Sequence, residues 1–173
     1  AFNGGISVTE IPDTIPPTLV SAVVDLGLYT LIFEMSETID VTPASNVDAS
    51  KVSVLNASAS LALNGSRLVG AYASGADSFH VTLHLTESQR TNILYKSKTP
   101  GGDYSGTVMK LFPSCIHDVA QVKNSIIEFV NLTEIADSVP PSLYSASIAL
   151  SHGYLTIRAT ETLDLSPFTV AKF

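Results

Sequence analysis

Residues 13–41 read DTIPPTLVSAVVDLGLYTLIFEMSETIDV, and residues 137–165 read DSVPPSLYSASIALSHGYLTIRATETLDL. The two stretches align without a gap at an offset of 124 residues, and eleven of the 29 aligned positions are identical. Average composition gives roughly two identities by chance. The identical positions are Asp13/Asp137, Pro16/Pro140, Pro17/Pro141, Leu19/Leu143, Ser21/Ser145, Ala22/Ala146, Leu26/Leu150, Leu31/Leu155, Glu37/Glu161, Thr38/Thr162 and Asp40/Asp164. The chain therefore contains an internal repeat, whose period exceeds that of solenoids and suits a whole β-sandwich of about 100 residues.

The repeat also defines candidate module boundaries. The same offset places residues 9–11 (TEI) on residues 133–135 (TEI), so the similarity extends upstream of the Pro-Pro pair. We predict that residues 1–12 form the last strand of a preceding repeat and that residues 13–136 form a complete repeat. Residues 137–173 then supply the opening strands of the following one.

Apolar residues alternate in both copies, which predicts the buried face of the first two strands. Period-two alternation is typical of an antiparallel sheet with one buried face. The residues expected to face inward are Val20, Ala22, Val24 and Leu26 in the first strand, Leu31, Phe33 and Met35 in the second, and their counterparts Tyr144, Ala146, Ile148, Leu150, Leu155, Ile157 and Ala159.

Further strands and one short helix follow from local patterns. β-Branched and aromatic residues predict strands over residues 52–55, 67–73, 79–85, 107–112 and 125–135. Thr86 and Gln89 have the spacing of a capping box, which predicts a helix of about two turns after Thr86. The expected fold is all-β: an immunoglobulin-like antiparallel β-sandwich, repeated in tandem every 124 residues or so, with one short helix.

Composition excludes several classes of function. The 173 residues include 45% hydrophobic and only 14% charged residues, a profile that suits a β-rich secreted protein. The net charge of −7 leaves no basic stripe for a phosphate backbone, so we expect no nucleic-acid partner. No apolar run approaches the roughly 20 residues that span a bilayer, so no membrane span is expected.

Nucleophiles and bases do not form a recognisable catalytic motif. Cys115 is the only cysteine of the sequence, and we predict that it is a buried thiol without a disulfide. Residues 114–118 (SCIHD) contain nucleophile and base types, but neighbours in one loop rarely present the geometry that catalysis needs. We expect no catalytic residues and no enzymatic activity.

Four segments of the chain carry a resemblance to a known family. They are the Pro-Pro opening followed by LxSAxxxL, the SETID segment at 36–40, LTESQRTNIL at 85–94 and IHDVAQVKN at 116–124. Together they resemble the immunoglobulin-like repeats of large secreted filament proteins of algae and other protists, such as mastigoneme proteins. Related domains occur in bacterial surface-layer and adhesin proteins. The resemblance implies an extracellular structural or adhesive polymer, with no catalytic residues to carry over.

The resemblance breaks down at one segment. The family commonly has an Asp followed shortly by Ala-Gly-Asn, whereas residues 118–124 read DVAQVKN. The glycine is missing and the spacing is longer, so the family's turn is not carried over to this segment.

Three sequons and two proline pairs are candidate sites of covalent glycans. The sequons begin at Asn56, Asn64 and Asn131. Asn56 and Asn64 flank a predicted turn and are expected to be exposed, whereas Asn131 lies in a predicted strand. The prolines Pro16, Pro17, Pro140 and Pro141 are candidates for hydroxylation and O-glycosylation, and a rigid joint between modules is the alternative interpretation.

Four acidic residues are candidates for a metal site, because a strand start, a strand end and a late loop can share one pole of a sandwich. They are Asp13, Glu37, Asp40 and Asp118. Calcium prefers such oxygen ligands, and it is the one candidate cofactor. The tight DxDxDG spacing of calcium loops is missing, so Glu37 accepting backbone amides is the alternative hypothesis.

The sequence thus predicts a structural subunit or repeat segment of an extracellular, glycosylated filament. Modules would associate end to end, and residues 1–12 would complete a neighbouring sandwich by strand donation. The alternative function is an adhesin or carbohydrate-binding module of a cell-surface protein. The absence of Trp weighs against the alternative, because carbohydrate and adhesive sites favour exposed aromatic rings.

Overall fold

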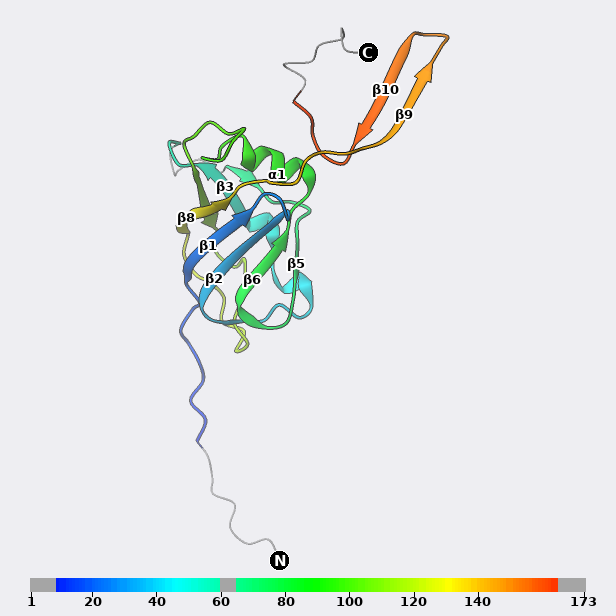
Figure 1. Cartoon of the computed structure of the whole chain (residues 1–173). Helices are drawn as coiled ribbons and strands as arrows, with labels where there is room; N and C mark the ends of the chain where they lie inside the picture. The colour runs from blue at the N-terminus through cyan, green and yellow to red at the C-terminus, as the bar shows by residue number, and fades with distance from the viewer. Residues whose placement is uncertain (1–8, 60–64, 165–173) are drawn as a thin grey trace, which may run out of the picture.

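The structure is a computed structural model that describes residues 9–59 and 65–164 (Figure 1). Eight strands form one sheet in the order β4-β3-β7-β8-β1-β2-β6-β5, and β9 and β10 form a separate hairpin. The strands are β1 (Leu19–Asp25), β2 (Thr30–Ile39), β3 (Val52–Asn56), β4 (Ser66–Arg67), β5 (Tyr72–Ser74), β6 (Ser78–His84), β7 (Thr107–Leu111), β8 (Glu128–Ile135), β9 (Leu143–Ala149) and β10 (Tyr154–Ala159). The all-β prediction is confirmed.

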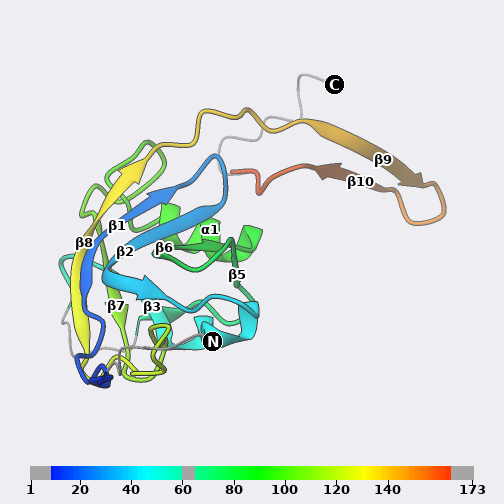
Figure 2. The same cartoon turned by 90° about the horizontal axis from the view of Figure 1, so that it is seen from below.

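The sheet curls around a single core. In Figure 2, β1, β2 and β6 lie on one side of the curl and β3 and β7 on the other. The core includes Val24, Leu26, Leu31 and Phe33 from β1, β2 and their turn, Val81 and Leu83 from β6, Val52 and Val54 from β3, and Met109 and Leu111 from β7. Burial of these side chains is the main source of stability, at about 25 cal/mol per Å² of apolar surface.

The short helices lie in the connections between strands. The helix predicted after Thr86 is confirmed as α1 (Glu87–Leu94), and the Thr86–Gln89 capping box is present. Two 3₁₀ helices, η1 (Ala44–Asn46) and η2 (Ala49–Lys51), precede β3 and were not predicted. The strand predicted over residues 67–73 is instead two short strands, β4 and β5, because a turn with Gly70 at φ +92° separates them.

Two details of the sheet differ from the sequence prediction. The pairing is not wholly antiparallel, because β1 pairs with β8 in parallel, from Ala22 opposite Leu132 to Asp25 opposite Ile135. Val20 does not face inward and is 53% exposed. A β-bulge lies at this point of β1: Leu19 pairs with Met35 and Ser21 pairs with the adjacent Glu34, so Val20 is an extra residue without a partner on β2. The extra residue shifts the alternation, so Leu19 takes the place of Val20 against the core.

The β9–β10 hairpin has the local geometry of β1–β2. Leu143 pairs with Ala159 and Ser145 with Arg158, which reproduces at an offset of 124 the pairs Leu19–Met35 and Ser21–Glu34. The bulge therefore recurs at Tyr144, which is 63% exposed like Val20. In Figures 1 and 2 the hairpin extends away from the curled sheet.

The apolar face of this hairpin is exposed among the described residues. Ile148, Leu150 and Leu155 are 62%, 84% and 58% exposed, whereas their counterparts Val24, Leu26 and Leu31 are all 0% exposed. Of the set predicted to face inward in the second copy, Ile157 and Ala159 are half-buried and the other five residues are exposed. The reason is that side chains of β3 and β7 join the core that covers the apolar face of β1 and β2, whereas β9 and β10 form a separate sheet and pair only with each other.

Candidate functional site

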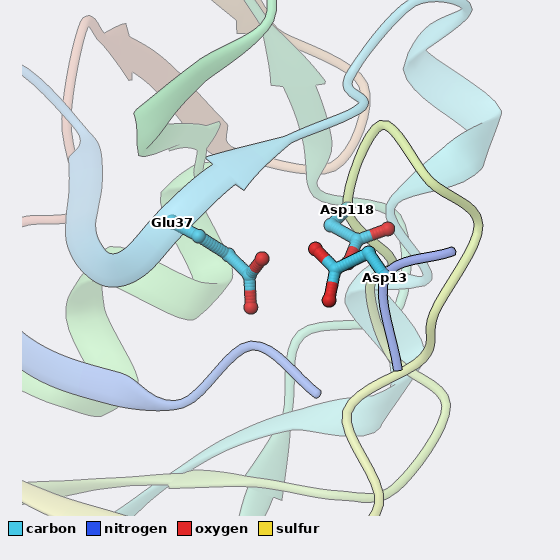
Figure 3. Close-up of side chains that lie close together, drawn as sticks. All are labelled: Asp13, Glu37 and Asp118. Atoms are coloured by element: carbon cyan, nitrogen blue, oxygen red, sulfur yellow. The ribbon is translucent and has the colours of Figure 1, made fainter. Parts of the chain in front are cut away.

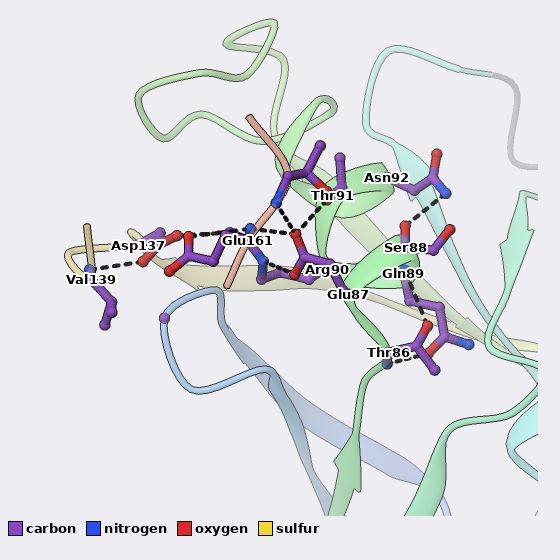
Figure 4. A network of polar contacts seen from close by, with 12 residues as sticks. Thr86, Glu87, Ser88, Gln89, Arg90, Thr91, Asn92, Asp137, Val139 and Glu161 are labelled. Atoms are coloured by element: carbon purple, nitrogen blue, oxygen red, sulfur yellow. Dashed lines mark hydrogen bonds and ion pairs between the residues drawn. The ribbon is translucent and has the colours of Figure 1, made fainter. Parts of the chain in front are cut away.

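The most highly charged contact in the structure joins helix α1 to the two ends of the β9–β10 hairpin (Figure 4). Arg90, on α1, has a side chain that is only 3% exposed. Its Nε donates to Glu87 Oε2 at 2.7 Å and its Nη2 donates to Glu87 Oε1 at 2.8 Å. This two-pronged pair fixes the plane of the guanidinium. The capping box fixes the first turn of α1, from which Glu87 projects.

The remaining donors of Arg90 bind acidic residues of the second copy. Nη1 donates to Asp137 Oδ2 at 2.7 Å, and Nη2 lies 3.5 Å from Glu161 Oε2. Asp137 precedes β9 and Glu161 follows β10, so one side chain binds both ends of the hairpin (Figure 4). The Thr162 amide adds a hydrogen bond to Glu87 Oε1 at 2.8 Å. We call Glu87, Arg90, Asp137 and Glu161 the junction cluster.

The electrostatics of the junction cluster depend on this single guanidinium. The hydrogen bonds from Arg90 lower the pKa of Glu87 to about 2, although burial opposes the shift. Burial and the nearby Asp137 carboxylate raise the pKa of Glu161, and the charge of Arg90 only partly offsets them. Arg90 also lies over the Tyr29 ring, 5.0 Å from its centroid, which adds a cation–π contact. Three carboxylates therefore share one cation.

The backbone that presents Asp137 is the same as the backbone that presents Asp13. The Ile15 amide donates to Asp13 Oδ1 at 2.9 Å, and the Val139 amide donates to Asp137 Oδ1 at 2.9 Å. Such Asx turns are set by local sequence, here the Asp that precedes each Pro-Pro pair. The next step also recurs, since the amides of Thr18 and Ser142 donate at 2.9 Å to the hydroxyls of Ser36 and Thr160.

A second acidic cluster consists of Asp13, Glu37 and Asp118 (Figure 3). Glu37 lies near the end of β2 that pairs with Ser78, whereas α1 follows the other end of β6, where His84 pairs with Thr30. One carboxylate oxygen of each residue lies within 4.8 Å of the others. Asp118 is 1% exposed, and its Oδ1 accepts from the Val122 amide at 2.9 Å. Its Oδ2 is buried and has no hydrogen-bond partner among the described residues. We call these three residues the acidic acceptor.

The acidic acceptor carries uncompensated charge. Burial, followed by the charges of Asp118 and Asp13 and by a side-chain hydrogen bond with Asp118 that favours the protonated form of Glu37, raises the pKa of Glu37 above its ordinary value. None of the ion pairs in the described part of the chain includes Asp13, Glu37 or Asp118. Three carboxylates that face one another without a cation repel one another, so this end of the sheet is suited to bind a positively charged group.

Asp40 does not join the other three predicted metal ligands. Its Oδ2 accepts from Gln121 Nε2 at 3.1 Å and lies 3.9 Å from His117 Nδ1. Its Oδ1 accepts from the Thr42 amide. These partners turn the carboxylate toward the 117–121 loop. Asp40 therefore lies apart from the cluster that Asp13, Glu37 and Asp118 form, and a metal at these residues stays a prediction.

The predicted glycan sites differ in accessibility. Asn131 is exposed on β8, although it lies within a strand as predicted. Asn56 is half-buried instead of exposed, because its amide donates to Asp103 and its Oδ1 accepts from the Ser58 amide at 2.8 Å. Asn64 lies outside the described residues.

The proline pairs also differ from each other. Pro140 and Pro141 are exposed, whereas Pro16 is half-buried and Pro17 is buried against the completed sheet. A modifying enzyme would reach only the second pair without displacing structure. The sequence treated both pairs as equivalent because it does not show which pair precedes a completed core.

The loop that holds the predicted nucleophile types is a structural element. Cys115 is 1% exposed, as predicted for a buried thiol, and burial raises the pKa of its thiol to about 12. Asn124 anchors the loop from inside, since its Oδ1 accepts from the Cys115 and Ile116 amides at 2.9 and 3.2 Å. A thiol held protonated in this way is a poor nucleophile.

Sequence reasoning located α1 but missed the role of Arg90. The three-residue spacing of Glu87 and Arg90 on a predicted helix is a weak signal for an ion pair. Asp137 and Glu161 lie 47 and 71 residues away from Arg90 in the chain, and no local pattern links them.

Comparison of the chain with protein-family models, curated proteins and solved structures finds no match. The search for candidate membrane helices, made over the described residues, finds none of sufficient length and apolar character. The two charged clusters and the two hairpins are therefore the features that bear on function.

Proposed function

We propose that this chain is a segment of a tandem array of immunoglobulin-like β-sandwich modules, and that the array is a structural component of an extracellular, glycosylated filament. In this proposal residues 13–136 form one module and β9–β10 opens the next. The observation that carries it is the second hairpin, which has the register, bulge and Asx turn of β1–β2 while its apolar face is exposed.

The contacts between α1 and the second copy support a mechanical role. Arg90 and Thr162 connect the helix of one module to both ends of the opening hairpin of the next. Such a joint would pass tension into a folded core through the helix as well as through the single backbone connection. The Pro140–Pro141 pair lies in that connection and restricts its bending.

Association of neighbouring chains extends the same proposal. An open hairpin is a template for strand addition, and residues 9–11 match the end of β8, the strand that pairs with β1. Another molecule of this chain would then supply its residues 1–12 to β9, in the parallel register that β8 has on β1. Thr133 pairs with Val23, and their counterparts at the offset of 124 are Thr9 and Ser147. Disulfide cross-linking between Thr9→Cys of one molecule and Ser147→Cys of another tests this. Cross-linking only within one chain would contradict strand donation.

Electron microscopy of the native material tests the main proposal. We expect filaments whose axial repeat matches one module, and glycopeptide mass spectrometry should find glycan at an exposed sequon such as Asn131. Isolated globular particles without an axial repeat would contradict the filament.

An adhesin or carbohydrate-binding module is the second candidate function. One observation favours it: Tyr72 on β5 is 61% exposed and stacks on His84 of β6, with ring centroids 4.9 Å apart. Sugar rings stack on such exposed aromatic faces. Binding to a glycan array that is lost in Tyr72→Ala would favour this function over the filament.

A further inference from the structure

We propose that the acidic acceptor, Asp13, Glu37 and Asp118, binds an arginine side chain presented by helix α1 of a neighbouring copy of this module. The inference rests on the proposed function and deepens it, because it names the contact that would join one module to the preceding one. It also assigns a ligand class, a guanidinium, to a cluster that the sequence interprets as a metal site.

The first observation is that the equivalent acids already bind a guanidinium in this chain. Asp137 and Glu161 are the counterparts of Asp13 and Glu37 at the offset of 124. Both contact Arg90, at 2.7 and 3.5 Å. The turn that orients Asp137 has the same hydrogen bond as the turn that orients Asp13. The acidic acceptor is therefore preorganised like a site whose ligand is known.

The second observation is the buried carboxylate of Asp118. Its Oδ2 is sequestered from solvent without a hydrogen-bond partner among the described residues, and it faces Glu37 and Asp13 (Figure 3). An unpaired buried carboxylate is costly, and a cation that donates hydrogen bonds offsets the cost. At the junction cluster Arg90 binds two acids of the second copy, Asp137 and Glu161, and is also paired with Glu87 of its own helix. The acidic acceptor offers Asp118 as a further carboxylate to the same kind of cation.

Guanidinium chemistry fits this arrangement better than calcium does. Arginine presents five donors in a planar fork and can satisfy several carboxylates at once, as Arg90 does. Calcium takes six to eight oxygen ligands, so the three acidic side chains that converge here would need further oxygens from bidentate binding, backbone carbonyls or water. The precedent within the chain is also a guanidinium and not a metal.

The placement of the two clusters gives the contact a direction. The junction cluster includes Glu87 and Arg90 of α1, which follows the end of β6 that pairs with the start of β2. The acidic acceptor includes Glu37, near the other end of β2 (Figure 3). A contact from the helix end of one module to the acceptor end of the next is heterologous, so it propagates along a line and does not close a dimer. This is the geometry that an end-to-end array requires.

Carboxyl carbon NMR of the full chain tests the inference with ethylguanidinium as the probe. We expect millimolar ethylguanidinium to move the Glu37 and Asp118 resonances to saturation, with a smaller effect from ethylammonium at equal ionic strength. Glu37→Gln should abolish the response of Asp118, whereas Glu34→Gln, on the same strand, should preserve it. The Asp137 and Glu161 resonances are the internal control, because Arg90 already occupies their site and they should respond only in Arg90→Ala.

Three results would overturn the inference. Saturation of the Glu37 and Asp118 shifts by CaCl₂ at lower concentration than by ethylguanidinium would make the cluster a metal site. A response of Asp137 and Glu161 in Arg90→Ala without a response of Glu37 would show that the two acidic pairs are not equivalent. The absence of any response at either pair would show that neither recognises a free guanidinium.

A tandem chain tests the neighbouring copy itself. Insertion of a second copy of residues 13–136 after residue 136 places Arg90 of the first copy before the acceptor of the second. Only the first acceptor should then respond to ethylguanidinium, and Arg90→Ala in the first copy should restore the response of the second. Equal responses of both acceptors in the unsubstituted tandem chain would contradict the contact. Microscopy tests the filament separately, so either proposal can fail without the other.

Discussion

The β1–β2 and β9–β10 hairpins have nearly the same local structure and very different surroundings. Their registers, bulges and four-residue turns agree at an offset of 124, although eighteen of the 29 aligned residues differ. Leu31 is fully buried between strands that come from distant parts of the chain, whereas its counterpart Leu155 is 58% exposed. Local sequence thus determines the pairing within each hairpin, and distant strands, including β3 and β7 across the core, determine burial.

The comparison also separates two ways of holding a hairpin. β1–β2 is held by its apolar face and by hydrogen bonds to strands on both edges. β9–β10 is held at its base by polar contacts to α1. Because an isolated two-stranded hairpin is only marginally stable in water, the junction cluster is the main restraint on the position of the second copy.

Equivalent leucine substitutions should give the largest difference in stability between the two hairpins. Leu31→Ala should lower the free energy of unfolding of the sheet by about 2–5 kcal/mol, because it leaves a cavity in a closed core. Leu155→Ala should change it by less than about 0.5 kcal/mol, because the side chain is already exposed. Urea unfolding measured by circular dichroism distinguishes the two. Equal losses would contradict the different burial of the two hairpins.

Arg90→Ala should release the second hairpin without unfolding the first. The loss of hydrogen bonds between charged groups should weaken the junction by about 1.5–3 kcal/mol. Amide exchange at Thr162 should accelerate accordingly, while exchange in the core of β2 stays unchanged. Arg90→Lys is the matched control that keeps the charge and loses the two-pronged bond to Glu87. Unchanged exchange at Thr162 in Arg90→Ala would refute the restraint.

Acid should open the junction over a defined range of pH. The folded-state pKa of Glu87 is lowered from 4.5 to about 2, so its stabilising effect is complete above about pH 4.5 and is lost as the pH falls toward 2. Glu161 acts in the opposite sense, because its raised pKa means that protonation relieves repulsion as the pH falls. Thr162 exchange between pH 5 and 2, corrected for intrinsic rates, measures the balance. Glu87→Gln should remove the acid-dependent step.

Loss of the capping box should have the smallest effect on how firmly the second hairpin is held. Thr86→Ala removes the acceptor of the Gln89 amide and should destabilise α1 by about 1 kcal/mol. The junction should loosen in proportion, because Glu87 and Arg90 lie in the first turn of the helix. Thr86→Ser keeps the acceptor and should behave as the unsubstituted protein does. A loss in Thr86→Ser as large as in Thr86→Ala would show that the cap is not the cause.

Local patterns in the sequence were sufficient for several elements. Alternation placed β1, β2 and β6, the Thr86–Gln89 spacing placed α1, and the repeat identified β9–β10 as a second copy of β1–β2. Two of the three residues of the acidic acceptor also belong to the repeat, because Asp13 and Glu37 recur as Asp137 and Glu161. These features depend on residues close together in the chain or on an internal copy.

The features that were missed depend on distant partners. The bulge at Val20 reversed its predicted orientation, and the parallel β1–β8 pair brings together segments more than 100 residues apart. The hydrogen bond from Gln121 to Asp40 depends on how the 117–121 loop folds, which the sequence does not show. Asp40 was therefore wrongly grouped with the other three acids. Arg90 was overlooked because its partners lie in the other copy.

Amide hydrogen exchange along β1 and β9 of the full chain tests the central claim most directly. The claim is that two hairpins with the same register and bulge differ in stability mainly through their non-local neighbours. We expect the amides of β1 to exchange only through global unfolding, and the equivalent amides of β9 to exchange by local opening with much lower protection. Equal protection of the two strands would contradict the account.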